Sequence, residues 1–368
     1  MTFAVGKLLN ANPSTKDFTA HQMLACLSQR LPIEFNSTTY ITHAERKQVE
    51  GHMRVCLDID AGFQTMTTVS SSEPLLSEAA YVIMSRKSFD VLKCFKTVLD
   101  GFAVHKGDRG EFLALLLLTL ARDLAVGSPN DDGRPECRYF KFTPFVYGHL
   151  FKSPSKSPSD LATLERDFPN AKMHFNHFVK LHDFKTIDKE TLLRLMTRGA
   201  GVLCANSQAS IAAVTVFLKS GTKLTTDNFG LVLYQFKNNP SYTKNPQSKL
   251  FQSMDPYDLE ILQEGDAAVP IVKIFFALAA KVAGLHVKRH PASEAYNAVV
   301  YEIWCAGLAP EYLEPICANE VDIWKGLLQA SYRWKNIYKA AVNEDARRSM
   351  NPGTANDGGH WSRWNASD

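Results

Sequence analysis

The sequence predicts an α/β fold in which helices flank a mixed β-sheet. A long apolar helix is predicted over 107–126, and two β-rich segments, 210–221 and 229–238, follow it as a hairpin with a polar turn. Two further apolar segments, 270–280 and 296–308, have a periodicity that fits either a strand or a helix. An apolar helix followed by strands and more apolar segments indicates helices packed around a sheet.

The helix at 107–126 is apolar nearly all round after Glu111, which is typical of a helix buried on most sides. Asp108 and Glu111 have the D-x-x-E spacing of a capping box, in which the first carboxylate accepts a backbone N–H. That interpretation gives Glu111 a structural role. It leaves open that Glu111 also faces a functional site.

Turn residues and periodicity assign the rest of the N-terminal half. Alternating β-formers predict strands within 53–69, and apolar residues at helical spacing predict two short helices within 70–100. We expect the turn-rich stretch 128–138 and the Ser/Pro/Lys-rich stretch 152–160 to be exposed connections. His174, His177 and His182 lie among Phe and Leu, which favours a partly buried aromatic-rich helix over a zinc site.

In the C-terminal half, a helix is predicted at 186–201, ended by Gly199 and Gly201, and an amphipathic helix at 321–341. The tail from 347 is expected to be disordered. We therefore divide the 368 residues into an N-terminal strand and helical region at 1–100, an α/β core at 101–310 with an insertion near 152–160, and a C-terminal helix and flexible tail at 311–368.

Charge and cysteine content limit the classes of function. The chain has 41 basic and 38 acidic residues, so a nucleic-acid surface would have to be a local patch. Seven widely spaced cysteines without a C-x-x-C pair argue against a disulfide scaffold and a zinc ribbon. The longest apolar run, 112–121, is far shorter than the ~20 residues of a membrane helix. We expect an intracellular protein of the cytoplasm or nucleus, without membrane association.

Motifs of several enzyme classes are not found in the sequence. There is no G-x-S-x-G nucleophile motif, no G-x-x-x-x-G-K-[ST] phosphate loop, no Rossmann G-x-G-x-x-G and no kinase motif set. ATP- and NAD-dependent enzymes are therefore disfavoured.

The segment 229–238 ends in Gln235 and Lys237, two positions apart and hence on one face of a strand. A strand leaving the core, with its lysine reaching solvent, explains the pair simply. The order of a helix-start Glu111 and a later Q-x-K also resembles the PD-(D/E)xK nucleases, in the form found in Mrr-like restriction enzymes. The resemblance implies a restriction-endonuclease-like core, Mg²⁺ or Mn²⁺ at Glu111 and Gln235, and Lys237 beside the attacking water.

The chain departs from that pattern at one position. The family has an Asp on the strand before Q-x-K, and the corresponding place here holds Ala212. Asp227 lies in the turn, only eight residues before Gln235. The resemblance thus implies a DNA phosphodiesterase that is impaired. The alternative is an inactive nuclease-like protein that serves as a protein-interaction or DNA-binding module.

A wider resemblance links segments 70–80, 107–123, 232–238 and 299–308 to a set of uncharacterised fungal proteins. It adds no activity. For DNA contact, the basic stretch 281–291 offers Lys288 and Arg289, which would touch phosphates without reading sequence. The simpler interpretation is that these charged side chains are exposed to solvent at the rim of the fold and bind nothing.

Overall fold

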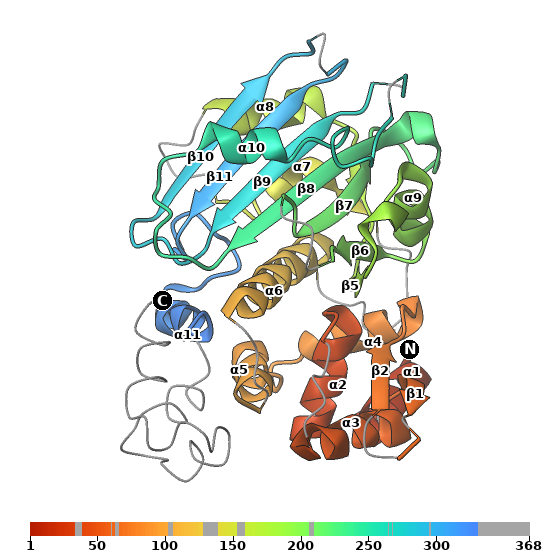
Figure 1. The fold of residues 1–368 in the computed structure, drawn as a ribbon. Helices are drawn as coiled ribbons and strands as arrows, with labels where there is room; N and C mark the ends of the chain where they lie inside the picture. Colours follow the sequence, from red (N-terminus) through yellow and green to blue (C-terminus); the bar gives the residue numbers. More distant parts are fainter. Residues whose placement is uncertain are drawn as a thin grey trace, which may run out of the picture.

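The computed structural model describes residues 1–33, 39–59, 61–62, 66–101, 106–127, 139–152, 159–205, 210–263, 265–266, 268–293 and 296–329. Its centre is a curled mixed β-sheet with helices on both faces (Figure 1). The α/β class that the sequence predicts is thereby confirmed. No helix among the described residues is long and apolar enough to cross a membrane.

The sheet has nine strands within the described part of the chain. They are β3 (Phe140–Lys141), β4 (Lys172–Met173), β5 (His177–Lys180), β6 (Ala200–Leu203), β7 (Ala213–Leu218), β8 (Phe229–Lys237), β9 (Ile271–Ala277), β10 (Gly284–His290) and β11 (Val300–Ala306). The order across the sheet is β10-β11-β9-β8-β7. β7 then pairs with β6 near its start and with β4 near its end. β6 in turn pairs with β5, and β4 pairs with β3.

The middle of the sheet is an antiparallel meander followed by parallel strands. β6, β7 and β8 run antiparallel in turn, and β8, β9 and β11 are parallel. The predicted hairpin of 210–221 and 229–238 is confirmed as β7 and β8. The ambiguous segments 270–280 and 296–308 are strands, since both faces of a central parallel strand are buried and the strand reads as a continuous apolar run.

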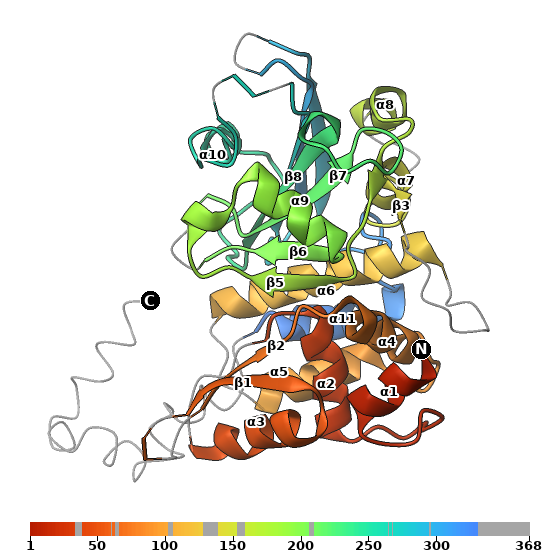
Figure 2. The same ribbon diagram turned by 90° about the vertical axis from the view of Figure 1, so that its right-hand side faces the viewer.

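Two hydrophobic clusters cover the two faces of the sheet. One contains Leu231 and Leu233 of β8 together with residues of α9 (Lys189–Thr197) and α10 (Ser248–Ser253). The other contains Val232 and Tyr234 and continues into the helices below the sheet. Those nearest the sheet are α6 (Lys106–Val126), α7 (Phe142–Val146) and α8 (Ser159–Asp167). α6 crosses between the sheet and a lower helical layer (Figures 1 and 2).

The lower layer is built by the N-terminal residues (Figure 2). It comprises α1 (Thr2–Leu9), α2 (Ala20–Arg30), α3 (Thr39–Gly51), α4 (Pro74–Met84), α5 (Val91–Gly101) and the antiparallel hairpin of β1 (Arg54–Ile59) and β2 (Met66–Ser70). The strands predicted within 53–69 and the helices predicted within 70–100 are confirmed. α1, α2 and α3 were not predicted, although Thr19 and Gln22 form a capping box at the start of α2.

The C-terminal half of the described chain contains one more α-helix, α11 (Val321–Leu327). Short 3₁₀ turns lie at Phe184–Thr186, Thr226–Asn228 and Ala318–Glu320. The predicted helix at 186–201 is confirmed as α9, which is followed by Gly199 at φ +66°. The remainder of the helix predicted at 321–341, from 330 on, lies outside the described residues, as do 128–138, 153–158 and the tail.

Two local predictions are wrong. α6 begins at Lys106, so Asp108 lies inside the first turn and cannot be the N-cap residue of a capping box with Glu111. The segment 174–182 is not a helix, because His177–Lys180 is strand β5, paired in parallel with β6. The predicted boundaries at 100 and 310 remain predictions, while one buried cluster runs from α1 through α6 to the sheet and α11.

Candidate functional site

The predicted site lies at the carboxyl end of β8. Gln235 is 5% exposed and Lys237 is half-buried. Alternation along the strand places both side chains on the face of Leu231 and Leu233, where α9 and α10 pack. The Oε1 atom of Gln235 accepts a hydrogen bond of 3.0 Å from the Phe236 backbone N–H.

Ala212 lies just before β7, the strand that pairs with β8. Ala213 is in register with Tyr234, and the Ala212 N–H donates to the Tyr234 carbonyl at 2.7 Å. A bond to the Tyr234 carbonyl rather than to that of Gln235 means that the pairing shifts by one residue before Ala213. Ala212 accordingly belongs with Tyr234 to the cluster on the α6 face of the sheet, not to the face of Gln235. Asp227 lies in the turn that precedes β8, at the opposite end of the strand from Gln235. The position that lacks the family's carboxylate therefore lies just before β7, at the end of the hairpin where β8 reaches Gln235 and Lys237.

The first turn of α6 packs against the residue that follows Lys237. A Cβ atom added to Gly110 would lie 2.8 Å from the Cβ of Asn238, so glycine permits this close approach. Glu111, the next residue, is half-buried.

Cys204 lies near Glu111 and is hydrogen-bonded to Ala212. Burial and then the nearby Glu111 carboxylate raise the pKa of the Cys204 thiol. The Cys204 N–H donates to the Ala212 carbonyl at 2.8 Å. The structure thus brings Glu111 near Cys204 at the end of α6 that meets β8, whereas the side chains of Gln235 and Lys237 lie on the face of β8 opposite to the one that α6 covers.

These residues do not complete a site for a hard divalent cation. The predicted set contains one carboxylate, and the amide oxygen of Gln235 already accepts a backbone hydrogen bond. Mg²⁺ in proteins is usually held by one or two carboxylates in near-octahedral oxygen coordination. Within the described ranges, no group of three or more His, Cys, Asp or Glu side chains is arranged to hold a metal ion.

A cavity of about 550 Å³ adjoins this end of β8. It is lined by Asn238 after β8, by Leu278 and Lys281 after β9, and by Leu308 after β11, with Lys325 of α11 on its wall. The three strands are parallel, so the cavity lies outside their carboxyl ends, where ligands bind in many open α/β sheets.

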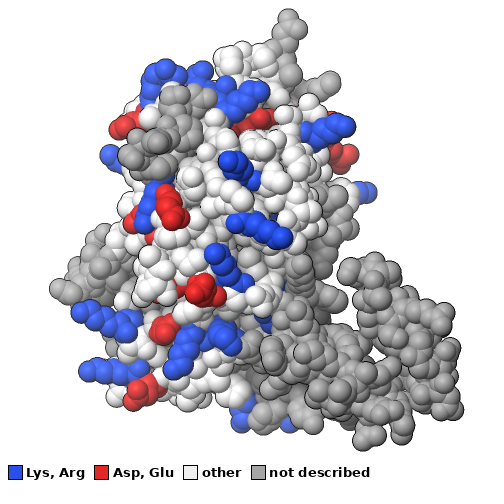
Figure 3. Space-filling view, turned by 90° about the vertical axis from the view of Figure 1, so that its left-hand side faces the viewer, with Lys and Arg blue, Asp and Glu red and all other residues white. Residues whose placement is uncertain are grey.

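The two predicted phosphate-contacting residues lie on the edge strand β10. Lys288 is exposed and in register with Glu302 of β11. The Arg289 guanidinium forms an ion pair of 2.6 Å with Asp167, which raises the pKa of Arg289. On the face drawn in Figure 3, basic side chains are spread out with acidic ones among them. Because of its ion pair with Asp167, the charge of Arg289 is largely neutralised.

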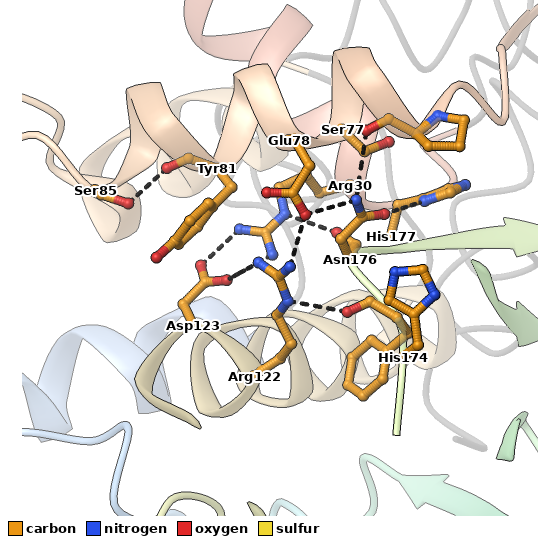
Figure 4. Close-up of polar contacts among 12 residues, drawn as sticks. Arg30, Ser77, Glu78, Tyr81, Ser85, Arg122, Asp123, His174, Asn176 and His177 are labelled. Atoms are coloured by element: carbon orange, nitrogen blue, oxygen red, sulfur yellow. Dashed lines mark hydrogen bonds and ion pairs between the residues drawn. The ribbon is translucent and has the colours of Figure 1, made fainter. Parts of the chain in front are cut away.

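A second polar cluster, which the sequence did not reveal, lies at the other end of α6 (Figure 4). Arg30 of α2 binds both carboxylate oxygens of Asp123, at 2.6 and 2.7 Å. Arg122 donates to Glu78 of α4 at 2.7 Å and lies over the ring of Tyr81. The adjacent Arg-Asp pair at the end of an apolar helix was the only local signal for this cluster.

This cluster also joins the helical layer to the sheet. Arg30 and Arg122 donate to the carbonyls of Asn176 and Phe175, each at 2.9 Å. Asn176 in turn donates to Glu78 at 2.9 Å. Arginine forks that bind carboxylates and carbonyls at once satisfy buried charges that would otherwise be costly.

Comparison with known families finds one match, which covers part of this fold. A model described as a domain of unknown function (DUF8736) matches residues 11–260, from just before α2 to just beyond α10. The chain belongs to the DUF8736 family. The matched range includes Glu111, Ala212, Gln235 and Lys237. No curated protein and no solved structure matches the chain.

Proposed function

We propose that this protein has a nuclease-like core of the PD-(D/E)xK type, and that its ancestral chemistry is metal-dependent hydrolysis of DNA phosphodiesters. We further propose that Ala212 leaves the chain with little or no cleavage activity. The observation that supports this best is that Ala212 stands just before β7, where the resemblance calls for an aspartate, and that β7 pairs with the strand that ends in Gln235 and Lys237.

The order of elements also supports the proposal. A helix that contains Glu111 near its start precedes the antiparallel strands β6, β7 and β8, and α10 then leads to β9, parallel to β8. The resemblance implies this αβββαβ order in the nuclease core. The elements from β3 to α9 would be an insertion between the first helix and the first strand of that core.

The proposed roles follow from the chemistry of each side chain. An aspartate at 212 would give two carboxylates with Glu111, and the Gln235 oxygen or a main-chain carbonyl would add a neutral ligand. The metal ion, when bound, would polarise the scissile phosphate. Lys237 would orient the water or stabilise the charge that develops on the phosphate.

The test compares the chain as it is with Ala212→Asp, using plasmid and single-stranded DNA with Mn²⁺. We expect cleavage by Ala212→Asp and little or none by the natural chain. Ala212→Asn is the matched control, because it adds a side chain of nearly the same size without the charge. Lys237→Ala introduced into the Ala212→Asp protein should abolish the gained cleavage.

Inactivity of every variant, together with no DNA binding by the natural chain, would overturn the nucleic-acid proposal. The alternative of a non-catalytic protein-interaction module would then be the better account. DNA binding without cleavage by Ala212→Asp would instead support a DNA-binding module that has lost more than one catalytic group.

A further inference from the structure

Four polar side chains form a continuous hydrogen-bonded chain between the helical layer and β5. The Ser72 Oγ atom lies 2.8 Å from Nε2 of His177, and Nδ1 of His177 lies 2.6 Å from Oδ1 of Asn176. Asn176 Nδ2 donates to Glu78 at 2.9 Å. Nothing in the proposed nuclease site uses these residues.

The direction of each hydrogen bond is fixed by its neighbours. Arg122 and Asn176 lower the pKa of Glu78 against the effect of burial, so Glu78 is ionised and can only accept. The Asn176 amide must therefore point its NH₂ group at Glu78 and its oxygen at His177. Nδ1 of His177 then carries the proton, and Nε2 is left with a lone pair that accepts from the Ser72 hydroxyl.

This is the arrangement of a nucleophile, a base and a residue that orients the base. Ser72 follows β2 and precedes α4, and so it lies in a strand–turn–helix connection. Its carbonyl oxygen accepts a 3.1 Å hydrogen bond from Nε of Arg198, which holds the turn in place. The sequence lacks G-x-S-x-G, so motif reading could not identify this serine.

The hydroxyl opens onto a cavity of about 250 Å³, separate from the one at the end of β8. Ser72 and His177 line it together with Leu57 and Val69 of the β1–β2 hairpin. Gln29, which is 2% exposed, also lines it, and its buried Oε1 atom has no hydrogen-bond partner. A cavity lined by both apolar and polar side chains, with one unsatisfied acceptor among them, suits a small ligand that carries a hydrogen-bond donor.

We propose that Ser72 is a nucleophile that His177 activates, with Asn176 as the positioning residue, and that the cavity accepts small activated carboxylic esters. The Ser72 oxygen would form a bond to the acyl carbon while its proton moves to Nε2 of His177. The ester's C–O bond would then break, and the leaving oxygen would take that proton. Water would later release the carboxylic acid by the reverse sequence.

The charges around His177 define which esters can react. They come from every neighbouring element: Arg30, Arg122, Arg198, His174, Glu78, Asp123, and, on the cavity wall, Arg54, Lys180 and His182. Burial, followed by the nearby arginines, lowers the pKa of His177 to about 3. Such a weak base gives little driving force for proton transfer. We therefore expect slow acylation by esters with good leaving groups, and no reaction with amides.

The experiment is labelling of the natural chain with an alkyl fluorophosphonate, which forms an Oγ–P bond and releases fluoride. Mass spectrometry of the intact protein and of its peptides should show one label, on Ser72. Ser72→Ala should not be labelled, and Ser253→Ala, which alters an exposed serine of α10 that does not line this cavity, should be labelled like the natural chain. His177→Gln should slow labelling at least tenfold, with folding of each variant checked by circular dichroism.

The pH profile separates this site from an ordinary reactive serine. Because His177 stays neutral, the labelling rate should be constant from pH 8 to 5.5, whereas a base with the usual histidine pKa would lose about tenfold. Label on other residues, labelling no faster than in urea-denatured protein, or a tenfold loss by pH 5.5 would each overturn the proposal. Hydrolysis of p-nitrophenyl acetate that disappears in Ser72→Ala would support it independently.

Discussion

Arg122 is the residue on which the polar cluster at the end of α6 depends most. Its side chain is fully buried, donates to Glu78 at 2.7 Å and to the Phe175 carbonyl at 2.9 Å, and lies 4.8 Å from the centre of the Tyr81 ring. Removing one partner of a buried ion pair leaves an uncompensated charge, which costs more than the pair itself contributes.

We predict that Arg122→Met lowers the free energy of unfolding by about 3–5 kcal/mol, measured by urea denaturation. Adding Glu78→Met to this variant should recover part of the loss, since the stranded carboxylate is then removed. Arg194→Met is the control, because Arg194 and Glu190 are exposed on α9 and their pair should contribute less than about 1 kcal/mol. Equal losses for Arg122→Met and Arg194→Met would contradict the role of the buried cluster.

At the scale of single residues, some members of the candidate sites could be predicted from the sequence and others could not. Gln235 and Lys237 could be found because they are two positions apart on one strand, and strand periodicity alone puts them on one face. The partner of Arg122, Glu78, is 44 positions away, and that of Arg30, Asp123, is 93 positions away. Contacts that depend on tertiary packing leave no local pattern, and for this reason the Ser72, His177 and Asn176 chain was also missed.

Among the elements, β7 and β8 show how closely the central strands pack. Gly230 of β8 is in register with Phe217 of β7, and an added Cβ would lie 2.3 Å from the Phe217 ring. That ring is stacked on Phe142, with centroids 4.3 Å apart, so it cannot easily move away. Glycine is required here by its lack of a side chain.

Gly230→Ala should therefore destabilise the protein by about 1–3 kcal/mol, as overpacking in a close-packed core does. Gly326 of α11 provides the contrast, because an added Cβ there meets no atom within 4 Å. Gly326→Ala should stabilise by up to about 1 kcal/mol through helix propensity. Thermal unfolding of the two variants tests both, and a stable Gly230→Ala protein would show that the sheet can relax around Phe217.

Elements with strong periodicity could be predicted, and others could not. α6 and the β7–β8 hairpin follow directly from apolar runs and turn residues. β5 was mistaken for a helix because His174 and His177 have the three-residue spacing of a helix face. Its pairing with β6 arises only in the folded sheet. α2 was missed although its Thr19 and Gln22 spacing is a capping-box signal that sequence reading can use.

At the scale of the whole molecule, the folded protein should lose stability in acid, because the pKa values of His177 and Glu78 are lowered in one buried cluster. His177 has a pKa of about 3 in the folded state, below the ordinary value of 6.5. The unfolded chain therefore binds a proton first as the pH falls, and stability is lost from about pH 6.5 down to about 3. The lowered pKa of Glu78 adds a further loss, which begins as the pH falls below the ordinary value of 4.5.

We expect the free energy of unfolding to fall by about 1.4 kcal/mol per pH unit below pH 6 from His177 alone. Urea denaturation at pH 7, 6 and 5 measures this slope. His177→Gln removes the titrating group, so its slope should be smaller than that of the natural chain by that amount. Identical slopes would mean that His177 is not buried as a neutral imidazole.

We propose above that Glu111, Ala212, Gln235 and Lys237 are what remains of a metal-dependent phosphodiesterase site. Binding of Mn²⁺ to Ala212→Asp tests this most directly, because it needs no knowledge of the DNA substrate. By electron paramagnetic resonance titration, we predict one Mn²⁺ bound to Ala212→Asp, none to the natural chain or Ala212→Asn, and at least tenfold weaker binding after Glu111→Gln is added. Binding by Ala212→Asp no tighter than by Ala212→Asn would contradict the claim.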